Sequence, residues 1–237
     1  MKIELPIWAY LIGTVILFGF IVIVGKDVVI PFINNERDVF YNLPSSPPDN
    51  YISSEIDYIA QIYTTAGTFT VKVSPRYAPE NSNNFLYLAS IDYYNDTKFS
   101  RVIESFLIQG GDRATVNNTP IDDGEGRTGY FIRDEVNWDD LSLSDQRRQE
   151  LQTLGYSNNT DNPSLRMKRF SLAMANIGPN TNSAQFFIIT AENNDIRLQQ
   201  LSGKYTVIGE VLDGFDTLES IISSATRDIT EHIKITS

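Results

Sequence analysis

Residues 99–112 read FSRVIESFLIQGGD, and this stretch decides the fold that the sequence predicts. Its apolar residues form two short runs, 99–103 and 106–111, which is typical of two β-strands joined by a turn. Arg101 and Gln109 interrupt these runs. Either Arg101 is an outward-facing strand charge and Gln109 fixes a loop, or the pair carries chemistry.

The rest of the chain from residue 55 is also rich in strands. Strands are predicted at 57–64, 68–73, 169–176, 184–190, 205–211 and 231–237, and helices at 78–91 and 215–224. Strands and helices do not alternate as in βαβ units, so we expect a mainly β fold, an antiparallel barrel or sandwich with a few peripheral helices. A polar insertion at about 137–167 contains one short helix, with Ser142 and Asp145 as a capping box and Gly155 as its stop.

The amino-terminal part has a different composition. Residues 5–25 carry no charge and are long enough to cross a hydrocarbon core, so we expect a transmembrane anchor at 1–27, the alternative being a cleaved signal peptide. Residues 28–54 include NLPSSPPDN and are expected to form a stalk. The predicted organisation is an anchor, a stalk and a folded domain at 55–237. The protein would be single-pass, with its carboxy-terminal domain outside the cytoplasm.

Composition excludes several kinds of chemistry. The formal net charge is −11, which argues against nucleic acid as a partner. The chain has no cysteine and a single histidine, His232, so thiolate nucleophiles and multi-histidine metal sites are not expected.

Two further motifs have plainer interpretations. GEGRTG at 124–129 matches a dinucleotide fingerprint in letters, but it does not link a strand to a helix, so we expect a flexible loop. The acidic pairs Asp134–Glu135 and Asp139–Asp140 are interpreted as surface charge.

A second segment, SLAMANIGPNTNSAQFFIIT at 171–190, again sets amides (Asn176 and Gln185) beside apolar residues. FSRVIESFLIQGGD, MANIGPNTNSAQFFI and GKYTVIGEVLDGFDTLESI occur in the same order as three blocks of the cyclophilins, the peptidyl-prolyl cis-trans isomerases. The chain resembles this family from about Tyr58 to Ile235. The resemblance implies a closed antiparallel β-barrel and isomerisation of X–Pro bonds, with no cofactor and no metal.

The resemblance also implies roles for individual residues. Rotation about an X–Pro bond is opposed by about 18–20 kcal/mol of amide resonance, and Arg101 would stabilise the twisted prolyl nitrogen. Gln109 would orient either Arg101 or the substrate carbonyl, and Asn176 would pair with the peptide main chain. The full set is Arg101, Phe106, Gln109 and Asn176 as catalytic residues, and Ile103, Leu107, Gly124, Ala175, Ile177, Gln185, Phe187, Leu201 and Tyr205 as substrate-binding residues.

The sequence departs from the family pattern at several of these positions. Ser100 and Tyr205 stand where histidine is usual, Gln200 stands where many members have tryptophan, and Leu107 replaces methionine. These departures motivate one alternative, a catalytically weak peptide-binding or scaffold module.

From the resemblance as a whole we expect an isomerase that acts on proline-containing, unfolded or partly folded polypeptides at a membrane. The sequence does not determine the oligomeric state.

Overall fold

The computed structural model describes residues 43–117, 123–224 and 230–236. A compact unit begins at Pro44 and extends to the carboxy terminus. The predicted anchor at 1–27 lies outside the described residues. Within the described ranges, no helix has both the length and the apolar character needed to cross a membrane.

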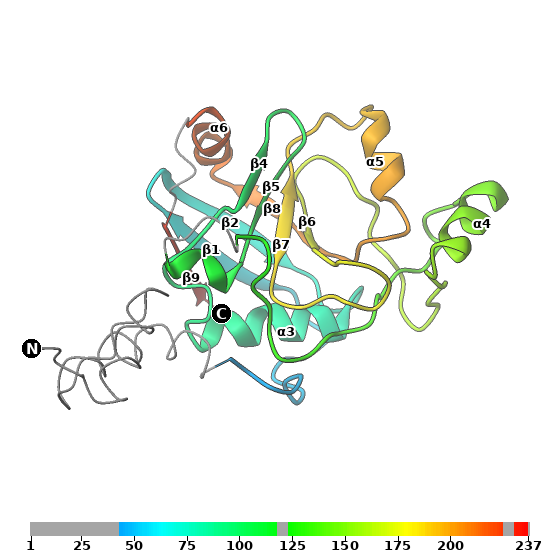
Figure 1. Ribbon diagram of the computed structural model, residues 1–237, viewed down its shortest axis with the longest axis horizontal. Coiled ribbons are helices and arrows are strands. Elements are labelled where there is room, and N and C mark those ends of the chain that lie inside the picture. Colours follow the sequence, from blue (N-terminus) through cyan, green and yellow to red (C-terminus); the bar gives the residue numbers. More distant parts are fainter. Residues whose placement is uncertain (1–42, 118–122, 225–229, 237) are drawn as a thin grey trace, which may run out of the picture. The chain divides into compact units, whose positions relative to one another are not determined.

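The compact unit is built on one antiparallel sheet (Figure 1). Its nine strands lie in the order β3-β9-β1-β2-β8-β6-β7-β5-β4. The strands are β1 (Tyr58–Thr64), β2 (Gly67–Val73), β3 (Thr97–Lys98), β4 (Arg101–Ile103), β5 (Leu107–Gly110), β6 (Ser171–Met174), β7 (Phe186–Ile189), β8 (Val207–Asp213) and β9 (Thr230–Thr236). The helices are α3 (Pro79–Ser90), the 3-10 helix η1 (Arg113–Asn117), α4 (Asp145–Thr153), α5 (Ile196–Leu201) and α6 (Phe215–Ser223).

The mainly β, antiparallel architecture is confirmed, but the expectation of a closed barrel is not. The two outermost strands are β3 and β4, and no ladder between them occurs in the described part of the chain. An isolated bridge joins Lys98 to Asp112 near this gap. Because β3 has two residues and β4 three, neither strand is long enough to form a continuous ladder across the opening.

The burial of each strand follows its sequence pattern. In β2, Phe69, Val71 and Val73 are buried and the residues between them are not, which is the period-two pattern of a strand with one face on the core. In β6 and β7 every residue is buried. Both faces of these central strands are therefore covered. The face that carries Ala173 and Phe187 belongs to the site described below.

Helix α3 packs beneath the sheet through an aromatic contact. The rings of Phe85 and Phe186 meet edge to face with centroids 5.4 Å apart. Pro79 occupies the first turn of α3, where a missing N–H costs nothing. The Glu135 carboxylate accepts hydrogen bonds from the main-chain N–H groups of Glu80 and Asn81, at 3.1 and 2.9 Å. A distant acid therefore caps this helix.

The segment before β1 lies against α3. The main-chain N–H of Tyr51 donates to the Asn83 Oδ1 at 2.7 Å, and Asn83 Nδ2 donates to the Asp49 carbonyl at 3.0 Å. The Tyr51 ring meets Tyr87 edge to face at 5.9 Å. The last residues of the predicted stalk, from Pro44, are therefore part of the compact unit.

Three local predictions differ from the structure. The cap of α4 is Ser144, whose hydroxyl accepts from Arg147 N, and not Ser142. Ser142 has a φ of 54°, and its hydroxyl instead accepts from Arg166 at 2.9 Å. The sequence reading missed η1 and α5, although Asp195 caps α5 through its side chain.

Candidate active site

A row of side chains crosses one face of the sheet from β4 to β6. Arg101 pairs with Gln109, Gln109 pairs with Phe187, and Phe187 pairs with Ala173. Directly paired residues of an antiparallel ladder point to the same face. The register therefore places the guanidinium, the amide and the phenyl ring of these three segments side by side. Two residues along, Ile103, Leu107 and Ile189 form the next row on that face.

This face carries an apolar cluster. Its buried members are Leu107, Ala173, Phe187, Ile189, Ala191, Leu198 and Val207, and the partly buried Ile103, Phe106, Leu165, Met167, Ala175, Leu201 and Tyr205 pack against them. Phe187 meets Tyr205 edge to face with centroids 5.3 Å apart. The guanidinium of Arg197 lies 4.2 Å above the Phe106 ring. Partly buried apolar side chains over a closely packed base offer a surface for a small apolar ring.

Arg101 lies at the edge of this cluster and is exposed. Within the described residues, no carboxylate forms an ion pair with Arg101. Burial raises the pKa of Tyr205, and the charge of Arg101 opposes that rise. The phenol of Tyr205 is therefore close enough to sense the guanidinium. An uncompensated cation beside an apolar surface is available to a polar atom of a bound ligand.

Gln109 links the face to the glycine-rich loop. Its Nε2 donates to Gln185 Oε1 at 2.8 Å. Gln185 Nε2 in turn donates to the carbonyls of Gly124 and Gly126, at 2.9 and 2.8 Å. Among the described residues, no group donates to Gln109 Oε1, so this oxygen can accept from Arg101 or from a ligand.

Asp112 holds the glycine-rich loop from below. Its carboxylate is fully buried and accepts from the main-chain N–H groups of Gly124 and, at 2.8 Å, Ala114. A Cβ at Gly126 would lie 1.9 Å from Asp112 Oδ1 and 2.6 Å from Ala114 N. Only glycine fits at Gly126, which explains a glycine in this loop without any nucleotide.

A cavity of about 140 Å³ lies between this loop and the 175–185 segment. Its lining includes Gln109, Gly124, Ala175, Asn176, Ile177 and Gln185. Ala175 also belongs to the apolar cluster, so the cavity and the cluster are neighbours. Ile177 is 72% exposed at the rim. With Arg101 placed by its register, every predicted site residue lies in one continuous region.

Asn176 is one of the residues that line this cavity. Its side chain is held from inside the protein, since Nδ2 donates to the Lys204 carbonyl at 3.0 Å and to Asp134 Oδ1 at 3.2 Å. The flanking N–H groups of Ala175 and Ile177 bond to Gln185 O and Thr181 Oγ1. In the described residues the N–H and C=O of Asn176 have no protein partner. They are free to pair with an extended peptide.

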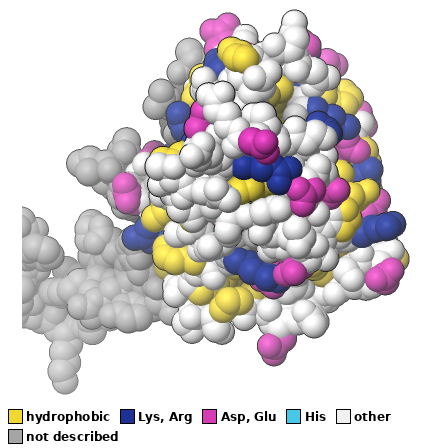
Figure 2. Space-filling model, turned by 90° about the vertical axis from the view of Figure 1, so that its right-hand side faces the viewer, with side chains coloured by type: hydrophobic (Ala, Val, Ile, Leu, Met, Phe, Trp, Pro, Cys, Tyr) yellow, Lys and Arg dark blue, Asp and Glu magenta, His cyan; other side chains and the backbone are white. Residues whose placement is uncertain are grey.

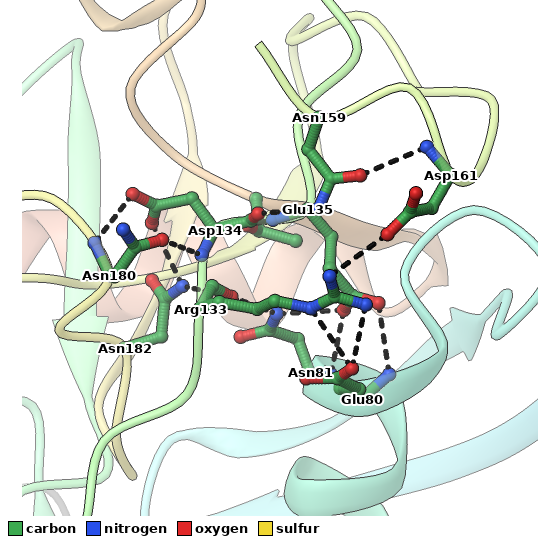
Figure 3. Close-up of polar contacts among 10 residues, drawn as sticks. Glu80, Asn81, Arg133, Asp134, Glu135, Asn159, Asp161, Asn180 and Asn182 are labelled. Carbon is green, nitrogen blue, oxygen red and sulfur yellow. Dashed lines mark hydrogen bonds and ion pairs between the residues drawn. The ribbon is translucent and has the colours of Figure 1, made fainter. Parts of the chain in front are cut away.

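The sequence reading was wrong about Asp134 and Glu135, which are 7% and 4% exposed. Figure 3 shows Asp134 between Asn180 and Asn182. Its carboxylate accepts from the Asn180 N–H at 2.7 Å and from Asn182 Nδ2 at 3.0 Å. Burial raises the pKa of Asp134, and these bonds oppose the rise. Asp134 therefore fixes the loop that carries Asn176.

An asparagine-rich loop was the one available signal for this arrangement. The stretch NIGPNTN at 176–182 contains three side-chain amides. Amides that become buried need hydrogen-bond acceptors nearby, and a carboxylate can supply them. By contrast, Asp139 and Asp140 are exposed, as expected for surface charge.

Two of the noted departures have a local setting in the structure. The Ser100 hydroxyl oxygen is buried and has no hydrogen-bond partner in the described residues. Gln200 is exposed near the end of α5, and its main-chain carbonyl accepts from Arg147 at 2.6 Å. Among the described residues, no cluster of three or more His, Asp or Glu side chains could hold a metal ion.

The face therefore combines an unneutralised guanidinium, an apolar cluster and free main-chain groups, which are the groups that a site for an extended peptide requires. Residues 59–237 match the family described as cyclophilin type peptidyl-prolyl cis-trans isomerase/CLD. The chain belongs to this family, and the prediction made from its three sequence blocks is confirmed.

Similar proteins support the same assignment. "Peptidyl-prolyl cis-trans isomerase 9" of Schizosaccharomyces pombe is 34% identical over 197 residues, which are 80% of this chain and 27% of that protein. "Peptidyl-prolyl cis-trans isomerase-like 1" of Homo sapiens is 31% identical over 175 residues, which are 74% of this chain and 83% of that protein.

Solved structures agree. The crystal structure of a cyclophilin type isomerase from Cryptosporidium parvum is 27% identical, with a TM-score of 0.56, and the match covers 77% of this chain and 99% of that one. A second structure of that protein, determined in the presence of the dipeptide Ala-Pro, has a TM-score of 0.54 and covers 76% of this chain and 99% of that one.

Proposed function

We propose that this chain isomerises X–Pro bonds in unfolded or partly folded polypeptides while tethered to a membrane. The single observation that carries the isomerase proposal is the row of Arg101, Gln109 and Phe187 on the face of the sheet that carries the apolar cluster. The Cryptosporidium relative crystallised with Ala-Pro supports a proline-containing ligand. The uncharged run at 5–25 supports the tether.

The proposed mechanism uses only fixed groups. The proline ring packs on the apolar cluster, and the main chain of Asn176 holds the peptide on one side of the rotating bond. As the amide twists, the prolyl nitrogen regains a lone pair, and Arg101 donates to it. Because this bond forms only in the twisted state, it lowers the barrier more than it stabilises the planar ground state.

Broad specificity follows from the nature of these contacts. The apolar cluster reads the proline ring and Asn176 reads the main chain, so few flanking side chains are recognised. The cavity beside Gln109 is small, about 140 Å³, and favours a short side chain before the proline.

A second candidate function is a peptide-binding module with weak turnover. The Ser100 hydroxyl oxygen is buried without a partner among the described residues, directly before Arg101 in the sequence. This favours the module, because an unsatisfied buried polar atom destabilises the segment that leads into β4.

An exchange assay separates these candidates. The full-length chain is added to a short X–Pro peptide, and cis–trans exchange is followed by NMR alongside peptide binding. Acceleration over the spontaneous rate supports the isomerase. Binding without acceleration supports the module. The absence of both binding and acceleration would contradict both candidates.

The tether is tested separately in cells. Carbonate-resistant membrane association of the full chain, lost when residues 5–25 are deleted, is the expected result. Protease digestion of the carboxy-terminal domain in intact cells or spheroplasts would support an orientation outside the cytoplasm. Complete release by carbonate would refute the anchor.

A further inference from the structure

The insertion at 137–167 is a folded part of the compact unit. Its buried residues Trp138, Leu141 and Leu151 form a small core with Val136, the residue before the insertion, and Leu143 and Tyr156 pack against this core. The guanidinium of Arg166 closes its base by donating to the carbonyls of Asp140 and Leu141, at 2.9 and 3.1 Å. An insertion with its own core can hold a side chain in a fixed place.

The insertion is hydrogen-bonded to the end of α5 and to the turn between α5 and β8. Trp138 Nε1 donates to the Gly203 carbonyl at 3.0 Å, and Arg147 donates to the Gln200 and Ser202 carbonyls at 2.6 and 3.2 Å. Gly203 has a φ of 88°, and a Cβ there would lie 2.5 Å from Leu151 Cδ1. This turn leads directly into Tyr205 of the apolar cluster.

A second fastening lies at the start of α3. Arg133 donates to Glu80 Oε1 at 3.0 Å and to Asp161 Oδ2 at 2.9 Å (Figure 3). Asp161 belongs to the insertion, and Arg133 precedes the buried Asp134. The insertion therefore contacts both segments that accept hydrogen bonds from the Asn176 side chain, residues 133–134 and residues 200–204.

Between these fastenings the insertion reaches the site. The Tyr156 hydroxyl donates to Asn176 Oδ1 at 3.3 Å. Both hydrogens of Asn176 Nδ2 are directed to Asp134 and Lys204, so its amide oxygen must face Tyr156. Three separate segments thus fix one side chain. Burial raises the pKa of Tyr156 to about 12, which keeps the hydroxyl protonated as a donor.

The outer surface of the molecule on this side has a different character. Figure 2 shows Lys and Arg side chains next to Asp and Glu side chains on the face turned toward the viewer. On the insertion itself, Arg148 pairs with Asp139 at 2.7 Å and Arg147 with Glu150 at 3.3 Å. Because these charges are paired, they do not form a surface of one sign that would attract a charged partner. The role of the insertion is therefore sought in its contacts with the rest of the protein.

We propose that the insertion is part of the peptide site and that Tyr156 is a positioning residue for Asn176. By holding the Asn176 amide, Tyr156 keeps the Asn176 main chain turned toward the peptide. Leu165 and Met167, also from the insertion, extend the apolar cluster under the proline ring. The inference rests on the proposed function, since it assigns this role within the same peptide site.

A double-mutant cycle in the full-length chain tests this role. Tyr156→Phe removes one hydroxyl and keeps the ring. We expect kcat/KM for an X–Pro peptide to fall about threefold to tenfold, the range of one hydrogen bond. In an Asn176→Ala background, the same change should have no further effect, because the two residues act as one unit.

Tyr63→Phe is the matched control. The Tyr63 hydroxyl also donates to a side-chain amide, Gln61 at 2.6 Å, but Tyr63 lies in β1, outside the site. This control should keep wild-type kcat/KM. Undiminished activity of Tyr156→Phe, or an equal loss in both backgrounds, overturns the proposal.

Peptide binding separates failure of this inference from failure of the proposed function. The dissociation constant of the same X–Pro peptide is measured by NMR titration for all four members of the cycle. If the wild type binds the peptide without turnover, the isomerase proposal fails. The four proteins of the cycle are then compared by their dissociation constants instead of by kcat/KM. A threefold to tenfold weakening seen only with Asn176 present still supports the role of Tyr156. Equal constants refute it.

Discussion

Removing the guanidinium of Arg101 tests the proposed mechanism most directly. Arg101 is exposed and has no ion-pair partner in the described residues, so Arg101→Ala should alter the free energy of unfolding by no more than about 0.5 kcal/mol. Its proposed bond to the prolyl nitrogen exists only in the twisted state. The loss should therefore fall on the rate of isomerisation and not on folding.

The magnitude is estimated for one fixed charge at contact distance from the twisted amide. At about 4 Å and an effective dielectric constant of about 20, a unit charge contributes about 4 kcal/mol, and the partial charge on a twisted amide nitrogen takes only part of this. Loss of one fixed donor to a developing charge costs about 10²–10³ in rate, or about 2.7–4 kcal/mol. We expect kcat/KM of Arg101→Ala to fall by this factor. Arg101→Lys keeps the charge but loses the planar fork, so about a tenfold loss is expected.

The assay is catalysed cis–trans exchange of an X–Pro peptide, with urea unfolding as a check on stability. Arg76→Ala is the control, because Arg76 is also exposed but lies in the loop between β2 and α3. If Arg101→Ala retained activity within threefold of the wild type while Arg76→Ala behaved normally, the electrostatic account would be refuted.

Three further predictions concern the base and the rim of the site. Phe187 is 3% exposed, so Phe187→Ala should lower the free energy of unfolding by about 3–5 kcal/mol in urea titrations; a loss below about 1 kcal/mol would contradict the packing described. Gly126→Ala would place a Cβ 1.9 Å from Asp112 Oδ1, so the loop must move, and KM for the peptide should rise with kcat changed less; an unchanged KM would show that the loop does not contact the peptide. Burial raises the pKa of Asp112 from 3.8 to about 6, so the folded state retains a proton that the unfolded chain loses. The contribution of Asp112 to the free energy of unfolding should therefore fall as pH rises from about 4 to about 6, by at most about 3 kcal/mol, and Asp112→Asn should lack this contribution in urea titrations at each pH. Parallel pH curves for the two proteins would contradict the assignment.

The residues of the candidate site were named from the resemblance of three sequence blocks to a known family, and the strand ladders explain why several of these residues lie together. Arg101 and Gln109 lie eight positions apart on either side of a short turn, and pairing of these two strands brings them opposite each other. Phe187 joins them through the next ladder. Local pattern therefore determines this part of the geometry once the strands are correctly placed.

Contacts that depend on distant packing were beyond sequence reasoning. In the sequence, Asp134 and Glu135 have the character of surface charge. Their burial is possible only because loop amides and the N-terminus of α3 donate hydrogen bonds to them, and these partners are distant in sequence. The contact of Tyr156 with Asn176 depends on how an insertion folds back. The open edge between β3 and β4 also depends on where two very short strands end, which propensity does not determine.

The indole of Trp138 has a practical consequence. The chain has two tryptophans, Trp8 and Trp138, so Trp138 is the sole one from Pro44 onward. It is 1% exposed and bonded to Gly203, and an indole in such dry surroundings emits at shorter wavelength than one in water. In a variant lacking Trp8, its emission spectrum would report in real time whether the insertion is seated or has come away.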